Sequence, residues 1–249
     1  NTAGTNTAGT NTAGTMTGGS MTGGAMTGGV DMTPPDCSTA TVEAPCQVSI
    51  YSARQVNLVP DLMPVEVEGV VTALRINDDG EASHVVLQDP AGGPWSGVWV
   101  YLNDADVDAL PIFTRGETVR LSGQVADYFG QRQINTVTSI SQLGVGAVVN
   151  PQPVDPMSVA TNGIDSVAME GVLVTLSQVA VEEVDPVAGP GDMNPNNEFV
   201  VSGGLRVDDY LYPFTLPIVG DQFTSITGVL RLGNGDFKLI PRSAEDLLR

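Results

Sequence analysis

Positive charge is scarce in this sequence. The 249 residues include 10 Lys and Arg against 29 Asp and Glu, and the only lysine is Lys238. The resulting net charge of −19 repels nucleic-acid backbones and anionic membranes, and it favours solubility at high concentration. The charge balance therefore argues against a nucleic-acid partner and fits an extracellular setting.

Histidine is almost absent, which limits the chemistry available. His84 is the only one, and no Ser or Cys lies in a G-x-S-x-G motif. Metal hydrolases and activated nucleophiles need a group of ligands or a base that one histidine cannot supply. We therefore expect no enzyme activity and no cofactor, and we interpret His84 as a surface residue at the end of a strand.

Long apolar runs are also missing. No stretch reaches the roughly 18 to 20 consecutive apolar residues of a membrane span. The sequence shows no signal peptide, and it begins inside a repeat without Met, as expected of a processed or partial product. We predict an extracellular or cell-surface location from the remaining features.

Only two cysteines are present, Cys37 and Cys46, nine positions apart. In an exported protein such a pair is typically a disulfide that closes a small loop. The alternative is a metal site, although no histidine lies nearby to complete a zinc site. We predict the disulfide.

Residues 1–30 are six five-residue repeats without charge: NTAGT three times, then MTGGS, MTGGA and MTGGV. Such a segment has almost nothing to bury, which is typical of a flexible spacer. Two arrangements would instead order it: pairing with a neighbouring subunit as an added strand, or O-linked sugars. The candidate O-glycosylation sites are Thr2, Thr5, Thr7, Thr10, Thr12, Thr15, Thr17, Thr22 and Thr27.

From residue 64 onward, short β-type segments alternate with turn residues, a pattern that favours a β-barrel or sandwich. The predicted strands of the first half lie within residues 65–71, 85–87, 98–102, 118–125 and 133–137, and only 105–110 and 243–248 look helical. The second half repeats the scheme: Glu68–Thr72 matches Glu170–Thr175, and Gly116–Val119 matches Gly220–Phe223. We interpret this as a duplicated domain.

The strand motifs resemble a known family. The order E-G-V-V-T, L-Q-D-P, G-V-W-V-Y, G-E-T-V-R-L-S-G-Q-V and Y-F-G-Q-R-Q-I is similar to the OB-fold modules that accompany bacterial secreted nucleases of the endonuclease/exonuclease/phosphatase type and surface lipoproteins. The resemblance covers about residues 64–249. The catalytic domain that follows these modules in such nucleases does not follow them in this sequence, so no nuclease activity is carried over.

The expected fold class is all-β, with two tandem OB-like, Greek-key barrels behind the Thr/Gly-rich arm. The boundaries that we predict are an arm at 1–33, a Cys-bridged connector at 34–63, a first barrel at 64–149, a Pro-rich linker at 150–163 and a second barrel at 164–249.

Two groups of residues are candidate sites. Asp104, Asp106 and Asp108 form the D-x-D-x-D opening of a calcium loop, but Ala109 and Arg115 stand where an EF-hand needs Gly and Glu. A looser calcium site and a solvated acidic helix start are the two interpretations. The aromatic residues of the first barrel could stack on a ligand or pack in the core, and the ones we select as binding candidates are Trp95, Trp99, Tyr101 and Tyr128.

Two functional hypotheses follow. The first is a non-enzymatic structural protein, a subunit of a bacterial surface filament or coat that assembles into a homopolymer, with the arm glycosylated or in contact with a neighbouring subunit. The second is a tethered surface or secreted binding module, such as a lipoprotein or nuclease accessory, for a glycan, a peptide or a nucleic acid.

Overall fold

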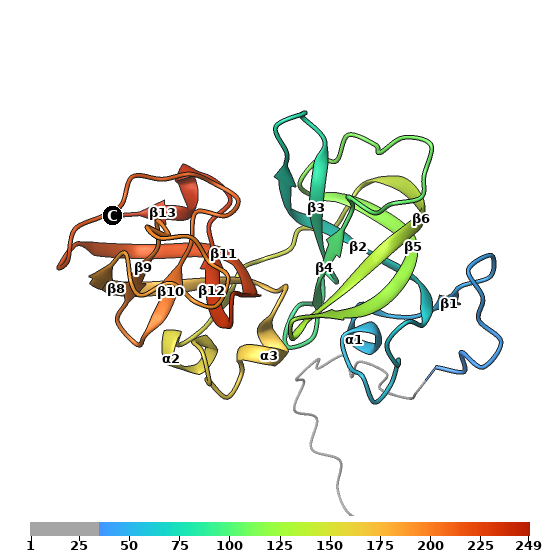
Figure 1. Cartoon of the computed structure of the whole chain (residues 1–249), viewed down its shortest axis with the longest axis horizontal. Helices are drawn as coiled ribbons and strands as arrows, with labels where there is room; N and C mark the ends of the chain where they lie inside the picture. The colour runs from blue at the N-terminus through green and yellow to red at the C-terminus, as the bar shows by residue number, and fades with distance from the viewer. Residues whose placement is uncertain (1–34) are drawn as a thin grey trace, which may run out of the picture. The chain divides into compact units, whose positions relative to one another are not determined.

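The computed structural model describes residues 35–249, which contain two closed β-barrels connected in tandem (Figure 1). The repeat arm and the nine threonines predicted to carry sugar lie outside the described residues. Within residues 35–249, no helix is both long and apolar enough to cross a membrane.

The first barrel consists of five strands: β2 (Pro64–Ile76), β3 (Ala82–Gln88), β4 (Gly97–Tyr101), β5 (Glu117–Tyr128) and β6 (Gln131–Val145). Their order is β2-β3-β4-β6-β5, and pairing between β2 and β5 closes the barrel. Only the β4–β6 pair is parallel among these five strands. Alternate side chains of β2 point inward because successive residues of a strand face opposite sides, so Val65 and Val67 are buried.

The second barrel repeats this topology. Its strands are β8 (Leu173–Val184), β9 (Phe199–Val201), β10 (Leu205–Val207), β11 (Gln222–Gly233) and β12 (Asp236–Ile240). Their order is β8-β9-β10-β12-β11, the β10–β12 pair is parallel, and β8 pairs with β11 to close the barrel. Strand β13 (Leu247–Leu248) extends the sheet beside β11.

A closed five-stranded Greek-key barrel with this strand order is the OB fold. The predicted fold class is therefore confirmed. Each predicted strand of the first half lies within or overlaps one of β2 to β6. The duplication is equally clear, because the hairpin β5–β6 of the first barrel corresponds to β11–β12 of the second.

Of the two helical predictions, one is wrong and the other is only partly right. Residues 105–110 form bends and irregular backbone rather than a helix, because the backbone N–H of Asp106 donates to the carbonyl of Val137 on β6 instead of to a helical carbonyl. The prediction for 243–248 is only partly right: a 3₁₀ turn, η1 (Ala244–Asp246), leads directly into β13.

The segments around the barrels are also ordered. The predicted Cys37–Cys46 disulfide is confirmed. After it come β1 (Cys46–Gln47), which pairs with β2, and the short helix α1 (Ile50–Ala53), which is capped by Ser49 and buried against the first barrel. Between the barrels lie β7 (Gln152–Pro153), paired with β8, and the short helices α2 (Pro156–Val159) and α3 (Ser166–Met169).

The two barrels share a small apolar contact. Its members are buried, and they come from the first barrel (Ala73, Val86, Trp99) and from the second (Leu173, Val229, Ile240). The indole N–H of Trp99 donates to the carbonyl of Leu230 at 3.1 Å, so the one polar atom of this ring is satisfied inside the contact. At Gly97 and Gly171 the two backbones approach so closely that a Cβ on Gly97 would lie 2.0 Å from the Gly171 carbonyl oxygen.

A buried ion pair borders this contact. The guanidinium of Arg54, just after α1, donates to the carboxylate of Glu170 at 2.8 Å, and the two side chains are 1% and 2% exposed. Burial raises the pKa of Glu170, while Arg54 opposes that rise. Arg54 also donates to the carbonyls of Arg132 and Val167. It therefore links the Cys-bridged connector to both barrels.

This geometry predicts a large stability effect. In Arg54→Met the Glu170 carboxylate is left buried without its cation, and we expect the free energy of unfolding to fall by about 3–5 kcal/mol in urea titrations at pH 7. The double variant Arg54→Met/Glu170→Met should recover most of that loss. The control is Arg120→Met, which removes an exposed pair with Glu68 and should cost less than about 1 kcal/mol. Equal losses in both single variants would contradict the prediction.

Candidate functional site

The candidate site is a groove on the outer face of β3, β4 and β6, beside the part of that face that the second barrel covers. Its first part is a cavity of about 290 Å³, which we call the polar cavity. Residues from both barrels line it: His84, Tyr101, Asp104, Tyr128, Gln131, Gln133, Asn135, Tyr210 and Arg231.

A second cavity of about 600 Å³ adjoins the first. It shares Tyr128, Gln131 and Arg231 with the polar cavity, and its remaining lining comes from two hairpin turns and one loop: Phe129, Pro190, Gly191 and residues 232–235. We call it the hairpin cavity, and the two together the inter-barrel groove. Both volumes are near or within the range of about 300–1,000 Å³ that is usual for ligand pockets.

The two hairpin turns have the same geometry. Phe129 and Gly130 connect β5 to β6 with φ of 51° and 89°, and Asn234 and Gly235 connect β11 to β12 with φ of 55° and 84°. Positive φ at both central positions is the type I′ turn that fits the twist of a tight hairpin. In the first hairpin the turn lifts Phe129 into solvent, where its side chain is 87% exposed.

Two buried donors in the groove have no hydrogen-bond partner. Gln131 is only 3% exposed, yet its amide nitrogen Nε2 is unpaired, and so is Nε of the half-buried Arg231. Among the residues that the structure describes, the only other such atom is Nε of Arg54, which lies outside the groove. A buried N–H without an acceptor costs about 1–3 kcal/mol, and an acceptor on a bound ligand would remove that cost.

Stacked side chains form one wall of the groove. The guanidinium groups of Arg75 and Arg231 lie 4.0 and 3.9 Å from the ring centroid of Tyr210, both within cation–π range. His84 packs edge-on against the same ring and against the buried Trp99. These contacts hold Tyr210 and Arg231 in place before any ligand arrives.

The electrostatic state of His84 follows from this packing. Desolvation by burial, together with the positive charges of Arg231 and Arg75, lowers its pKa from 6.5 to about 4. His84 is therefore neutral at physiological pH, and its Nδ1 lies 3.3 Å from the hydroxyl of Ser83. Sequence analysis placed it at a strand end, whereas it sits inside β3 and lines the polar cavity.

The structure separates the four aromatic binding candidates. Tyr101 and Tyr128 line the groove. Trp99 does not, because it is 0% exposed and its ring fills the contact between the barrels, so it supports the site from behind. Trp95 is half-buried in the loop between β3 and β4, where its backbone N–H donates to the carbonyl of Ala168. It lines neither cavity of the groove.

The acidic candidates do not assemble into a site. Among residues 35–249, no group of three or more His, Cys, Asp and Glu side chains could hold a metal ion. Asp104, Asp106 and Asp108 are all exposed, and Asp104 instead accepts a hydrogen bond from the backbone N–H of Thr136. The calcium interpretation therefore finds no support in their geometry.

In the second barrel, the face that corresponds to the groove is already filled by its own charges. Lys238 is 2% exposed and bonds to the carboxylates of Asp192, Glu198 and Asp208. Arg206 on β10 bonds to Glu198 as well, and its guanidinium donates to the carbonyl of Val187 in the long loop between β8 and β9. These side chains thus satisfy one another's charges.

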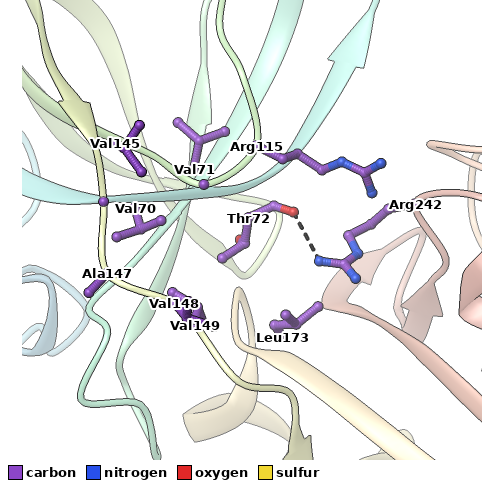
Figure 2. Close-up of a pocket in the computed structure, with 12 residues that line it drawn as sticks. Val70, Val71, Thr72, Arg115, Val145, Ala147, Val148, Val149, Leu173 and Arg242 are labelled. Carbon is purple, nitrogen blue, oxygen red and sulfur yellow. Dashed lines mark hydrogen bonds between the residues drawn. The ribbon is translucent and has the colours of Figure 1, made fainter.

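Another cavity, of about 400 Å³, lies under the segment that connects the barrels (Figure 2). Valine is the commonest residue in its lining, and Arg115 and Arg242 are its charged members. Arg242 is already bound to Asp246 and to the Thr72 carbonyl. Because the structure shows no unpaired buried polar atom among its lining residues, we consider the inter-barrel groove the better candidate.

Comparison with known proteins adds little beyond the fold. No protein-family model and no curated protein matches this chain. Among solved structures, the hypothetical protein ygiW from E. coli is 20% identical with a TM-score of 0.29, covering 39% of this chain and 88% of that one. The OB domain of MM0293 from Methanosarcina mazei is also 20% identical, with a TM-score of 0.30, covering 39% of this chain and 87% of that one.

Sequence reasoning missed most of the groove. The amides Gln131, Gln133 and Asn135 alternate with inward-facing residues along β6, a period-2 pattern that could have placed them on one outer face. Tyr210 and Arg231 come from the other barrel, and no local pattern indicates which first-barrel residues they meet.

The low pKa of His84 predicts a pH effect on stability. Between pH 6.5 and about 4, His84 is protonated in the unfolded chain but stays neutral in the folded chain. The stabilisation present above pH 6.5 is therefore lost as the pH falls. We expect that loss to be at most about 3 kcal/mol. His84→Gln cannot titrate, so its free energy of unfolding should fall less than that of the unmodified protein between pH 7 and pH 4. Parallel pH profiles in urea titrations would contradict this.

Proposed function

We propose that this protein is a non-catalytic, extracellular binding module that holds its ligand in the inter-barrel groove. The observation that carries the proposal is the pair of unpaired buried donors, Gln131 Nε2 and Arg231 Nε, in the lining of two adjoining cavities. Buried polar groups are nearly always hydrogen-bonded, so groups that lack partners at a cavity wall indicate where a ligand supplies them.

Other features support binding rather than chemistry. The groove combines amide and tyrosine side chains, which can donate and accept hydrogen bonds, with exposed aromatic rings at Tyr128 and Phe129. Its one histidine is neutral and packed among aromatic rings, beside the hydroxyl of Ser83. The disulfide is consistent with an oxidising compartment, which supports the extracellular location.

The filament or coat hypothesis concerns a different part of the chain. It depends on the repeat arm, which lies outside the described residues, and so assembly into a homopolymer stays a prediction. The two roles are compatible, because a module that displays a groove can also be part of a surface layer.

Gln131→Leu separates binding from stability. Leucine has a similar size but no N–H that needs an acceptor, so we expect the free energy of unfolding to stay the same or to rise. Binding should fall at least about tenfold for whichever ligand class an array of glycans, peptides and single-stranded oligonucleotides identifies with the unmodified full chain.

Two other glutamines serve as controls. Gln88 accepts a hydrogen bond from the backbone N–H of Leu173, so Gln88→Leu should destabilise the protein by about 1–3 kcal/mol. Gln142 lies outside the groove, and Gln142→Leu should leave binding unchanged. Full binding by the Gln131→Leu variant would overturn the proposed site.

A further inference from the structure

Pairing of positive charges in this chain is uneven. Seven of the ten Lys and Arg side chains form salt bridges, namely Arg54, Arg120, Arg132, Arg206, Lys238, Arg242 and Arg249. Within the described residues, which contain all ten, the structure shows no salt bridge for Arg75, Arg115 and Arg231. Two of these three, Arg75 and Arg231, flank the ring of Tyr210, and Arg231 also lines the inter-barrel groove.

The lack of a salt bridge at an arginine is unexpected from the composition of the chain. Carboxylates outnumber cations almost threefold in the sequence, so a cation that meets none has been kept apart from them by its surroundings. Arg231 is half-buried, and its Nε lacks any acceptor. Desolvating a guanidinium without a partner costs free energy, which a ligand carboxylate could return through charge-assisted hydrogen bonds.

We propose that the ligand of the groove is an acidic saccharide, a chain of at least two sugar units of which one carries a carboxylate. This inference rests on the proposed function and deepens it. The carboxylate pairs with Arg231 beside Tyr210, and the hydroxyl groups of the sugars pair with the amide side chains of Gln131, Gln133 and Asn135.

The shape and lining of the groove fit a short sugar chain. Its two cavities share three lining residues and therefore lie next to each other, so a chain of more than one unit could extend along both. The polar cavity supplies amides for hydroxyl groups. Tyr128 and Phe129, which are 57% and 87% exposed, supply apolar ring faces against which the C–H face of a sugar can pack.

The same groove is poorly suited to nucleic acid. A phosphate chain brings a negative charge with every unit, and it would meet Asp104 at the polar cavity as well as the net charge of −19. Arg231, the one arginine in the lining, can neutralise a single carboxylate but not a polyanion. Charge thus favours a ligand with an isolated negative group.

The experiment compares acidic saccharides with their neutral counterparts. The probes are tri- and tetrasaccharides that contain one uronate or one sialate residue, each paired with the same molecule after reduction of its carboxyl group to an alcohol. Titration calorimetry with the full chain at pH 7 should show at least one acidic probe binding about tenfold or more tightly than its reduced form.

Arginine variants test which residue binds the carboxylate. Arg231→Gln should weaken binding of the acidic form by a larger factor than binding of the reduced form, because only the acidic form loses a charge-assisted hydrogen bond. Arg115→Gln is the matched control, because Arg115 is the third arginine without a salt bridge but lines the cavity of Figure 2 instead. It should keep the full preference.

The outcomes separate this inference from the proposed function. If reduced and acidic probes bind equally and Gln131→Leu weakens both, the groove is a saccharide site and the acidic class is wrong. If peptides or oligonucleotides bind with the same sensitivity to Gln131→Leu, the groove is a binding site and the saccharide class is wrong. If no binding responds to Gln131→Leu, both proposals fail.

Discussion

The contact between the two barrels is the constraint on which the candidate site depends. It is small, and its specificity comes from polar groups that are satisfied only in one arrangement: the Trp99 indole on the Leu230 carbonyl, the Gln88 amide on the Leu173 N–H, and Arg54 on Glu170. Each of these pairs joins parts of the chain that are more than 80 residues apart. A shift of one barrel against the other would leave several buried polar groups unpaired, at a cost of about 1–3 kcal/mol each.

The two barrels use the corresponding outer face in different ways. In OB folds the outer face around the second and third strands is the usual ligand surface. In the first barrel, part of this face is used to hold the second barrel, and the rest remains open beside residues from both. In the second barrel, the corresponding face is closed by Lys238, Arg206 and the carboxylates that surround them. The outer face of the first barrel thus both packs against the second barrel and lines the groove.

The sequence indicates the barrels more readily than the groove. Alternation of apolar residues and Gly-containing turns are local patterns, and they predict strands such as β4 and β5 within a few residues. The failure at residues 105–110 has a tertiary cause, since the N–H of Asp106 is captured by β6. Trp99 was selected for its aromatic ring, but ring type alone does not distinguish a ligand platform from an interface anchor. Arg231 and Tyr210 could not be placed because their neighbours come from the other barrel.

Lys238 has a practical consequence. It is the only lysine in the sequence, and its ammonium group is enclosed by three carboxylates with 2% of the side chain exposed. Reagents that attack primary amines, such as activated esters, aldehydes and lysine-directed cross-linkers, therefore find no reactive side chain on the surface of the folded barrels. Proteases that cleave after lysine cannot reach the buried Lys238 side chain in the folded barrel either. The folded barrels would thus remain unmodified when this chemistry is used to attach a surface or a dye.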